Sequence, residues 1–297
     1  MIYDCFLFND ELDLLELRLE YMYNHVDFFV IAESSQTFTS LAKKLYFKEN
    51  KDRFSRFLSK IIHIEIAPNP SLDSAWENEY FQRNHIKTAL SNCSDQDIIL
   101  ISDVDEIINI ESIQLTTINK PVLVQLFYYY YFLNLKSNLY NEVVLLARYK
   151  DIAEKNIGNR LTYKNFACSS INCEEINTGW HFSYFFGNDI DRYTNKIKSF
   201  SHQEFNTEYI LNKNRIHTVL KYGIDFFERY DMRFFPVNAK KDLSVNLYKS
   251  ANQLGFLSKY SFKHPRPTSI NSKRELYFYT RYLKNIFRLN VEPSRQA

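Results

Sequence analysis

The sequence predicts an α/β protein built on a largely parallel sheet. Apolar runs at 1–8 and 27–32 have the length of strands and enclose a segment, ending near Tyr23, in which leucine and methionine recur at helical spacing. Both runs are apolar on two faces, as strands are when helices cover both sides of a parallel sheet. A third apolar run, 97–102 (DIILIS), is followed at once by acidic residues. Strands and helices that alternate in this way favour an α/β layer.

The other elements follow from local patterns along the chain. We expect a strand at 61–66, stopped by the prolines after it, and a helix at 74–90. The long run 121–133 (PVLVQLFYYYYFL) is expected to be the antiparallel partner strand that crosses below the site. Helices are expected at 206–221 and 276–289.

Neither a repeat nor a linker interrupts the chain. We therefore expect one domain over 1–235 and a C-terminal extension over 236–297 that packs on it. The last helix mixes lysine and arginine with aromatic residues. Two interpretations stay open for it, a solvated face and a peripheral contact with a membrane surface.

Composition and charge narrow the class of protein. The 297 residues are 45% hydrophobic, enough for a substantial core, and the net charge of +2 lacks the concentrated basic face of a nucleic-acid-binding protein. We expect no nucleic-acid partner. The 22 Tyr and 25 Phe are expected mainly in the core, with sugar stacking as their other use. With only 5 glycines the chain has neither G-x-G-x-x-G nor a P-loop, so cations would have to hold a bound nucleoside diphosphate.

The cysteines and the lengths of the apolar runs indicate the cellular compartment in which we expect the protein. Cys5, Cys93, Cys168 and Cys173 form no C-x-x-C pair, which favours free thiols in a reducing compartment over zinc or a redox dithiol. A bridge between Cys168 and Cys173 is the alternative. The acidic residues near the N-terminus argue against a signal peptide, and no apolar run reaches 18 residues. We expect a cytoplasmic protein, with membrane-peripheral attachment as an option.

Asp103-Val104-Asp105 carries the strongest chemical signal. These residues and Glu106 directly follow an apolar strand, at the carboxyl edge where open α/β sheets bind ligands. Carboxylates there are costly unless a positive charge is present, and their hard oxygens suit Mn²⁺ or Mg²⁺. We therefore predict that Asp103 and Asp105 hold a metal ion that bridges the phosphates of a nucleotide sugar.

The same motif has other interpretations. A helix start capped by Asp103 or Asp105 stays open. An EF-hand fails because Ile108 stands where that loop needs glycine. A metal-dependent phosphohydrolase with Asp103 as nucleophile also places D-x-D after a strand. It normally has threonine or valine where Ile107 stands, and the later acidic pair that it needs is missing.

Three more residues lie in distinctive contexts. Arg83, on the expected helix before the acidic motif, would be either a cation over the diphosphate or a salt-bridge partner of Glu79 one turn earlier. Trp180 and His181 follow a glycine in an aromatic stretch. Trp180 could stack on a sugar and His181 could bind the metal or acceptor hydroxyls, and simple packing is the alternative for both.

An inverting transfer needs a general base that takes a proton from the acceptor hydroxyl. Glu204 (SFSHQEF) and Asp225 (YGIDFFER) are the carboxylates in the most distinctive local contexts after the acidic motif. We name both as candidates, and a surface or capping role is the alternative for each.

Several ordered motifs resemble glycosyltransferase family 17. They are the opening segment 2–38, AWENEYFQRNHI, DIILISDVDEI, and GWHFSYFFG followed by KIKSFSHQEF, and the resemblance runs from Ile2 to about Arg233. The family includes the β-1,4-mannosyl-glycoprotein 4-β-N-acetylglucosaminyltransferase. The resemblance implies a GT-A fold, a Rossmann-like mixed sheet flanked by helices, and an inverting enzyme that uses a UDP-sugar and a divalent metal. Ile108 departs from it, since the family often has proline there.

The resemblance also assigns roles to residues. Asp103 and Asp105 match its metal motif, and Asn9, Glu11 and Glu33 match positions where GT-A folds hold the nucleoside. Arg83, Trp180 and His181 are assigned to phosphate and acceptor handling.

The implied reaction moves a hexose or N-acetylhexosamine onto a glycan or lipid-linked oligosaccharide. No stem or membrane anchor is seen, so we expect assembly of a surface polysaccharide rather than Golgi residence. A non-catalytic carbohydrate-binding protein is a further alternative.

Overall fold

The computed structural model describes the chain except residues 167–168, 172–175, 266–272 and 288–297. Cys168 and Cys173 lie outside the described residues, while Cys5 and Cys93 are free thiols. The strands are β1 (Ile2–Phe8), β2 (Phe28–Ser34), β3 (Ile61–Ile66), β4 (Ile98–Asp103), β5 (Glu106–Ile108), β6 (Val122–Tyr130), β7 (Leu135–Arg148), β8 (Ser169–Ile171), β9 (Gly179–Ser183) and β10 (Phe234–Pro236).

Helices and a mixed sheet together make an α/β fold, which confirms the predicted α/β class, while the GT-A type stays a prediction. The helices are α1 (Leu12–Met22), α2 (Tyr46–Glu49), α3 (Ala75–Asn84), α4 (Tyr149–Ile152), α5 (Ile190–Ser199), α6 (Glu208–Leu211), α7 (Lys213–Tyr222), α8 (Ala239–Asp242), α9 (Val245–Gln253), α10 (Phe256–Lys259) and α11 (Lys273–Phe287). The strand order is β3-β2-β1-β4-β7-β6-β9-β5, with β10 beside β7 and β8 beside β6.

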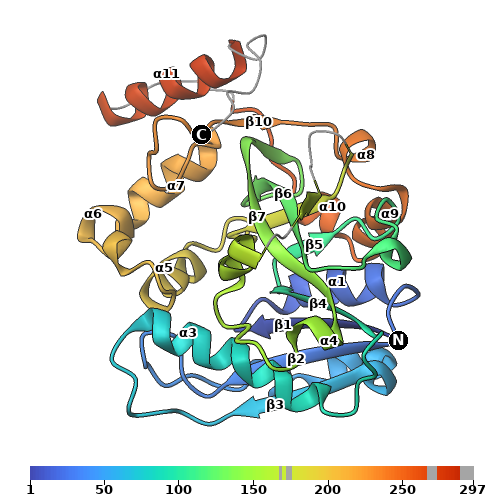
Figure 1. Cartoon of the computed structure of the whole chain (residues 1–297). Helices are drawn as coiled ribbons and strands as arrows, with labels where there is room; N and C mark the ends of the chain where they lie inside the picture. Colours follow the sequence, from blue (N-terminus) through green and yellow to red (C-terminus); the bar gives the residue numbers. More distant parts are fainter. Residues whose placement is uncertain (167–168, 172–175, 266–272, 288–297) are drawn as a thin grey trace. The chain divides into compact units, whose positions relative to one another are not determined.

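Four parallel strands, β3, β2, β1 and β4, lie side by side (Figure 1). The register pairs Phe8 with Glu33 and Leu7 with Asp103. The carboxyl ends of β1, β2 and β4 therefore share one edge of the sheet, and Asp103 lies on that edge. Strands β1, β2 and β4 are buried along most of their length, as expected when helices cover a parallel sheet, whereas the edge strand β3 is only partly buried.

The antiparallel partner of β4 is β7, which pairs Ile98 with Arg148 and Ile101 with Leu145. We had predicted this role for the segment 121–133, which instead forms β6, next to β7. That prediction was wrong because the first half of β7 (LKSNLYNE) is polar and gave no strand signal, whereas β6 is almost continuously apolar.

Residue contacts divide the chain into two compact units. Unit 1 comprises Met1–Leu126, Asn141–His181 and Ser199–Ser201, and unit 2 comprises Phe127–Tyr140, Phe182–Lys198 and His202–Ala297. Both units draw on separate stretches of the sequence. The predicted boundary between 235 and 236 falls inside unit 2 and stays a prediction.

Unit 1 contains the parallel strands and the helices α1 and α3. Ser74 caps α3: its hydroxyl accepts from the Glu77 amide while the Glu77 carboxylate accepts from the Ser74 amide. The predicted helix over 74–90 continues beyond α3 as a 3₁₀ segment, His85–Leu90. The face of α1 turned to the sheet is apolar apart from one buried arginine, Arg18.

Unit 2 has a core rich in aromatic rings. Tyr184, Tyr193 and Phe226 are buried with nearly parallel rings, whose centroids lie 5.8 to 6.2 Å apart. Part of the high tyrosine and phenylalanine content is therefore explained by core packing. The predicted helix over 206–221 is split into α6 and α7, and α7 ends at Gly223 in the left-handed conformation. Helix α11 packs against α7 (Figure 1).

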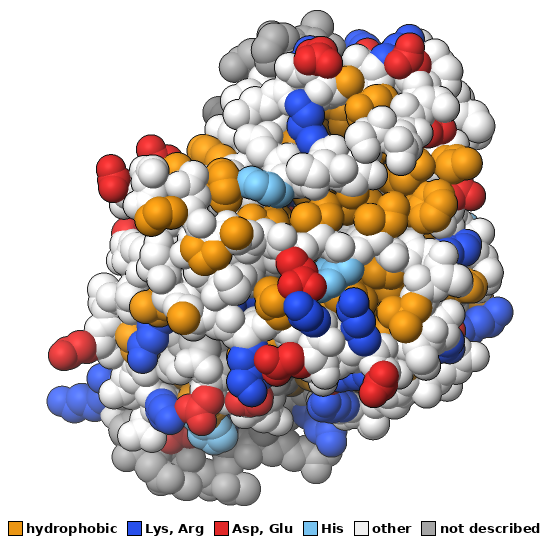
Figure 2. Space-filling model, turned by 90° about the horizontal axis from the view of Figure 1, so that it is seen from below, with side chains coloured by type: hydrophobic (Ala, Val, Ile, Leu, Met, Phe, Trp, Pro, Cys, Tyr) orange, Lys and Arg blue, Asp and Glu red, His pale blue; other side chains and the backbone are white. Residues whose placement is uncertain are grey.

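The charge pattern of the surface and the length of the helices agree with the composition. Basic and acidic side chains are intermixed on the face shown in Figure 2, as expected from a net charge of +2. Among the described residues, none of the helices has both the length and the apolar character needed to cross a bilayer.

Candidate active site

The acidic segment turns sharply between two strands. Asp103 ends β4, Val104 and Asp105 form the turn, and Glu106 begins β5. Strand β5 pairs with β9, which sets Glu106 opposite His181. A helix capped by Asp103 or Asp105, one of the open interpretations, is therefore ruled out. The pairing instead brings the predicted residues Asp103, Asp105 and His181 to one place in unit 1.

Gly179 makes this pairing possible. Its φ is +140°, and a Cβ built there would lie 2.7 Å from Ile108 Cα and 2.8 Å from the Asn109 amide nitrogen. Only glycine tolerates both the backbone conformation and the close approach of β5. Gly179 therefore fixes the position of His181, two residues later.

Two arginines hold the Asp103 carboxylate. Arg83 Nη2 lies 3.0 Å from one oxygen and Arg160 Nη2 lies 3.0 Å from the other. Burial raises the pKa of Asp103, but the charges of Arg160 and Arg83 outweigh it and hold the pKa well below its usual range. Asp103 still keeps 34% of its side-chain surface exposed.

Arg83 joins the acidic segment to its own helix. Its Nη2 also donates to Glu79 at 2.8 Å, and its Nη1 donates to the Gly158 carbonyl at 2.6 Å. The salt bridge to Glu79 is therefore real, and it coexists with the contact to Asp103 rather than excluding it. The neighbouring charges of Asp103 and Glu79 overcome burial and raise the pKa of Arg83 above its ordinary value.

Glu106 is buried under the same segment. Its carboxylate accepts from the Asp103 amide at 2.7 Å and forms a bidentate pair with Arg160. Burial raises the pKa of Glu106 to about 7, with the charges of Asp103 and Asp105 adding to the effect and Arg160 opposing it.

A second arginine cluster supports the backbone of the acidic turn. Arg18 is buried on α1 and forms a bidentate pair with Asp4, at 2.8 and 2.5 Å. Its Nη1 donates to the carbonyls of Asp103 and Glu106 at 2.9 and 2.8 Å, with a longer contact to Val104. The guanidinium thus holds the turn without touching an acidic side chain of the motif.

Asp105 and His181 lie beside the arginine-bound Asp103. His181 Nε2 is 3.7 Å from Asp105 Oδ1, and both side chains are largely buried. Around this point Glu79, Asp103, Asp105 and Glu106 supply four carboxylates against the guanidinium groups of Arg83 and Arg160. Among the described residues, the carboxylates here outnumber the guanidinium groups, and Arg18 does not change this count because it pairs with Asp4.

The donor set fits a divalent cation that is shared with a ligand. Within the described ranges, His, Cys, Asp and Glu side chains form no group of three or more that could hold a metal ion. Mg²⁺ sites commonly use one or two protein carboxylates and complete the shell with water and substrate phosphates. Asp105 with His181 can serve in that way, whereas both oxygens of Asp103 already accept from arginines.

The predicted nucleoside residues have structural partners. Glu33 is buried and accepts from the Phe47 amide at 2.9 Å and from His63 at 3.1 Å. The Asn9 carbonyl accepts from Lys43, and Glu11 accepts from the Asp10 amide. A nucleoside-binding role for Asn9, Glu11 and Glu33 stays a prediction, and Glu33 is the least suited because it is fully buried.

Trp180 does not fit its predicted role. Its ring is fully buried and packs edge-on against Tyr21, with centroids 6.0 Å apart. A sugar cannot stack on a ring that has no exposed face. The alternative, a packed tryptophan, describes this residue.

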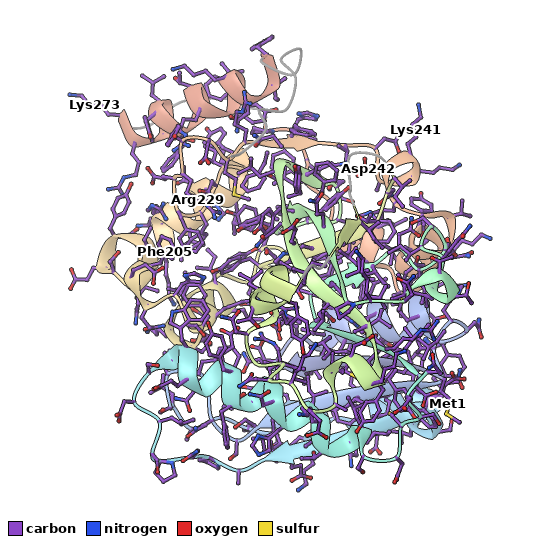
Figure 3. All side chains as sticks on the ribbon, in the orientation of Figure 1. Met1, Phe205, Arg229, Lys241, Asp242 and Lys273 are labelled. Atoms are coloured by element: carbon purple, nitrogen blue, oxygen red, sulfur yellow. The ribbon has the colours of Figure 1, made fainter. Side chains whose placement is uncertain are left out.

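The two candidate bases belong to unit 2 and differ in environment. Asp225 is fully buried, and Arg229 (Figure 3) donates to both of its oxygens from Nε at 3.0 Å and Nη2 at 2.7 Å. This neutralised carboxylate is a poor general base. Glu204 is exposed and accepts from His202 Nδ1 at 2.7 Å. The neighbouring Phe205 (Figure 3) packs on Phe227, with ring centroids 4.0 Å apart.

Sequence reasoning missed Arg160 and Arg18. Arg160 follows an irregular segment after α4, and nothing in its local sequence marks it. Arg18 did carry a signal, since it interrupts the apolar face of α1 while Asp4 interrupts the apolar strand β1. A buried strand and a buried helix face that each carry one opposite charge predict an ion pair.

Comparison with known proteins completes the description. The sequence profile of glycosyltransferase family 17 matches residues 1–244. A search of curated proteins finds no match. The profile spans β1 to α8, so it includes the acidic segment, both arginines that hold Asp103, and β9 with His181. The chain belongs to glycosyltransferase family 17.

Proposed function

We propose that this glycosyltransferase is an inverting, metal-dependent enzyme that transfers a hexose or N-acetylhexosamine from a UDP-sugar to a glycan or lipid-linked oligosaccharide. The observation that carries the proposal is the gathering of Asp103, Asp105 and His181 at one point where β4 ends, beside the arginines that hold Asp103. Carboxylates that gather at a partly buried site gain stability from a bound cation. The family supports the transferase chemistry.

Asp105 and His181 would hold the divalent cation, Mn²⁺ or Mg²⁺. When bound, the ion would neutralise the diphosphate of the donor as that group leaves. Asp103 has a different role in this proposal. Its oxygens retain lone pairs beyond those used by Arg83 and Arg160, and its exposed part can accept hydrogen bonds from donor hydroxyls. The two arginines keep Asp103 ionised and oriented for this purpose.

Glu204 is the better of the two candidate bases. Its carboxylate is exposed, and the hydrogen bond with His202 lowers the pKa of Glu204 against the opposing effect of burial. Asp225 is tied to Arg229 and is not proposed further. The phosphohydrolase alternative also loses support, because two guanidinium groups reduce the nucleophilicity of Asp103.

Hydrolysis of a panel of UDP-sugars, followed with Mn²⁺ and after its removal by a chelator, tests this function. We expect one donor to be hydrolysed with Mn²⁺ only, and Asp105→Asn to lose the activity. Asp95→Asn is the control, because this exposed carboxylate precedes β4 at the opposite end of the strand. Full activity in Asp105→Asn, or activity that survives chelation, would contradict the proposal.

A further inference from the structure

A basic pocket lies on unit 2, between α11 and the segment that precedes β10. It has a volume of about 300 Å³ and is lined by residues that include Glu228, Tyr230, Arg233, Tyr277, Arg281 and Lys284. Three of these side chains are cationic and one is a carboxylate. The proposed glycosyl transfer uses none of them.

The one carboxylate is already compensated from inside the unit. Glu228 pairs with the buried Arg215 at 2.7 Å and accepts from Tyr209 Oη at 2.7 Å. Its charge therefore does not neutralise Arg233, Arg281 and Lys284. The pocket keeps a net positive charge that attracts an anion.

The Arg281 guanidinium is oriented by hydrogen bonds within unit 2. Its Nη2 donates to the Arg229 carbonyl at 3.1 Å, and its Nη1 contacts the Tyr277 hydroxyl at 3.4 Å. A guanidinium has five N–H donors, so others remain for a ligand. Over the part of the chain that the structure describes, the Arg233 guanidinium and the Lys284 ammonium have no hydrogen-bond or ion-pair partner. Phosphate oxygens match such donors well.

An exposed apolar stripe runs beside the pocket. Tyr277, Arg281 and Lys284 recur at helical spacing on α11, and Leu276 and Phe287 lie on the neighbouring stripe of the same helix. Phe287 is 77% exposed and Tyr230, on the pocket wall, is 93% exposed. Cations next to exposed aromatic and aliphatic side chains are typical of surfaces that lie in the membrane interface. A soluble phosphate would use the cations but not this stripe.

We propose that this pocket binds the phosphate of an anionic lipid headgroup while the Leu276–Phe287 stripe enters the membrane interface. Helix α11 would thereby attach the enzyme to a membrane surface. Lys273, which starts α11 (Figure 3), adds charge on the same helix. The proposal is independent of the transfer reaction.

Vesicle flotation with the full chain tests the proposal. We expect binding to phosphatidylcholine vesicles that contain phosphatidylglycerol and little binding to phosphatidylcholine alone. Arg233→Gln/Lys284→Gln removes two charges near the surface and should weaken binding roughly 10- to 30-fold. Lys240→Gln/Lys241→Gln is the matched control, since it removes the same charge from exposed residues of α8 (Lys241, Figure 3) and should change binding only slightly.

A second variant and a soluble probe separate the sources of phosphate. Leu276→Ser/Phe287→Ser alters exposed side chains, so it should fold normally and lose vesicle binding. Calorimetry with inorganic pyrophosphate should show at most weak binding, unchanged in this variant. The proposal would be overturned if Arg233→Gln/Lys284→Gln and Lys240→Gln/Lys241→Gln lost vesicle binding equally, or if the protein showed no preference for anionic vesicles. Tight pyrophosphate binding without vesicle binding would also overturn it. Asp105→Asn should bind vesicles normally, which separates this result from a failure of the proposed function.

Discussion

Asp4 and Asp103 both pair with arginines in unit 1, yet their surroundings differ. Asp4 is fully buried, and one bidentate partner, Arg18, balances its charge. Asp103 is about a third exposed and shares Arg83 and Arg160 with two further carboxylates, Glu79 and Glu106. The first arrangement is complete within the protein. In the second, the carboxylates outnumber the arginines over the residues that the structure describes.

The difference separates a structural cluster from one that is suited to a ligand. Arg18 uses its remaining donors on the carbonyls of the acidic turn, so it fixes the backbone that carries Asp103 and Asp105. A charge-balanced ion pair can be fully buried, whereas an unbalanced cluster needs a cation or exposure to solvent. The two clusters thus support each other, one as scaffold and the other as site.

The largest effect is expected from breaking the balanced pair. Arg18→Met should leave the Asp4 charge buried without a partner and release the carbonyls of the turn, lowering the free energy of unfolding by about 3–5 kcal/mol. Urea unfolding measures this loss. The double variant Asp4→Leu/Arg18→Met should recover part of it, because no charge is then left buried. A single variant as stable as the wild type would remove the structural role assigned to Arg18.

Replacing Gly179 tests the link between backbone and site. Gly179→Ala should cost about 2–4 kcal/mol, since it combines a strained φ with a clash against β5. Gly255→Ala is the control: its φ is also positive, but nothing lies within 4 Å of the added Cβ, so it should cost only about 1 kcal/mol. Equal losses in thermal unfolding would show that close packing at Gly179 is unimportant.

The two candidate bases in unit 2, Asp225 and Glu204, also differ in burial and should respond differently to substitution. Asp225→Asn should lower the free energy of unfolding by about 2–3 kcal/mol, because it weakens a buried, charge-assisted contact with Arg229. Glu204→Gln changes an exposed residue and should stay within about 0.5 kcal/mol of the wild type. It should nevertheless keep donor binding and lose transfer. Normal transfer by Glu204→Gln would exclude Glu204 as the base.

The smallest effect on stability is expected at Asp105. Because Asp105 lies among other carboxylates of the described chain, Asp105→Asn removes a like-charge repulsion and should leave the free energy of unfolding unchanged or raise it by up to about 1 kcal/mol. A loss of several kcal/mol, measured by urea unfolding without added metal, would show that Asp105 is structural in the same way as Asp4.

The sequence alone predicted the fold class and most elements of the N-terminal half. Apolar runs bounded by polar residues marked β1, β2, β3 and β4, and the bounds of β3 agree with the prediction. These strands could be predicted because each is marked locally, by a short apolar run with polar residues or prolines at its end. Strand β7 was not predicted because its first half is polar.

The site was only partly predictable, because ion pairs between distant segments leave no local trace. The acidic motif and its place at the end of β4 were predicted, as was a link from Arg83 to Glu79. The contact of Arg160 with Asp103 joins residues 57 positions apart, and no pattern around Arg160 announces it. Trp180 and Asp225 are fully buried, which argues against sugar stacking by Trp180 and against Asp225 as the general base. Burial depends on tertiary packing, which the local sequence does not reveal.

Calorimetric titration of Mn²⁺ into the protein in the presence of UDP measures whether the end of β4 holds a cation. We expect one Mn²⁺ site in the wild type, an affinity about tenfold or more lower in Asp105→Asn, and no change in Asp95→Asn. A wild-type protein that binds no Mn²⁺, or an Asp105→Asn variant that binds it as well as the wild type, would contradict the claim that the acidic segment at the end of β4 holds a cation.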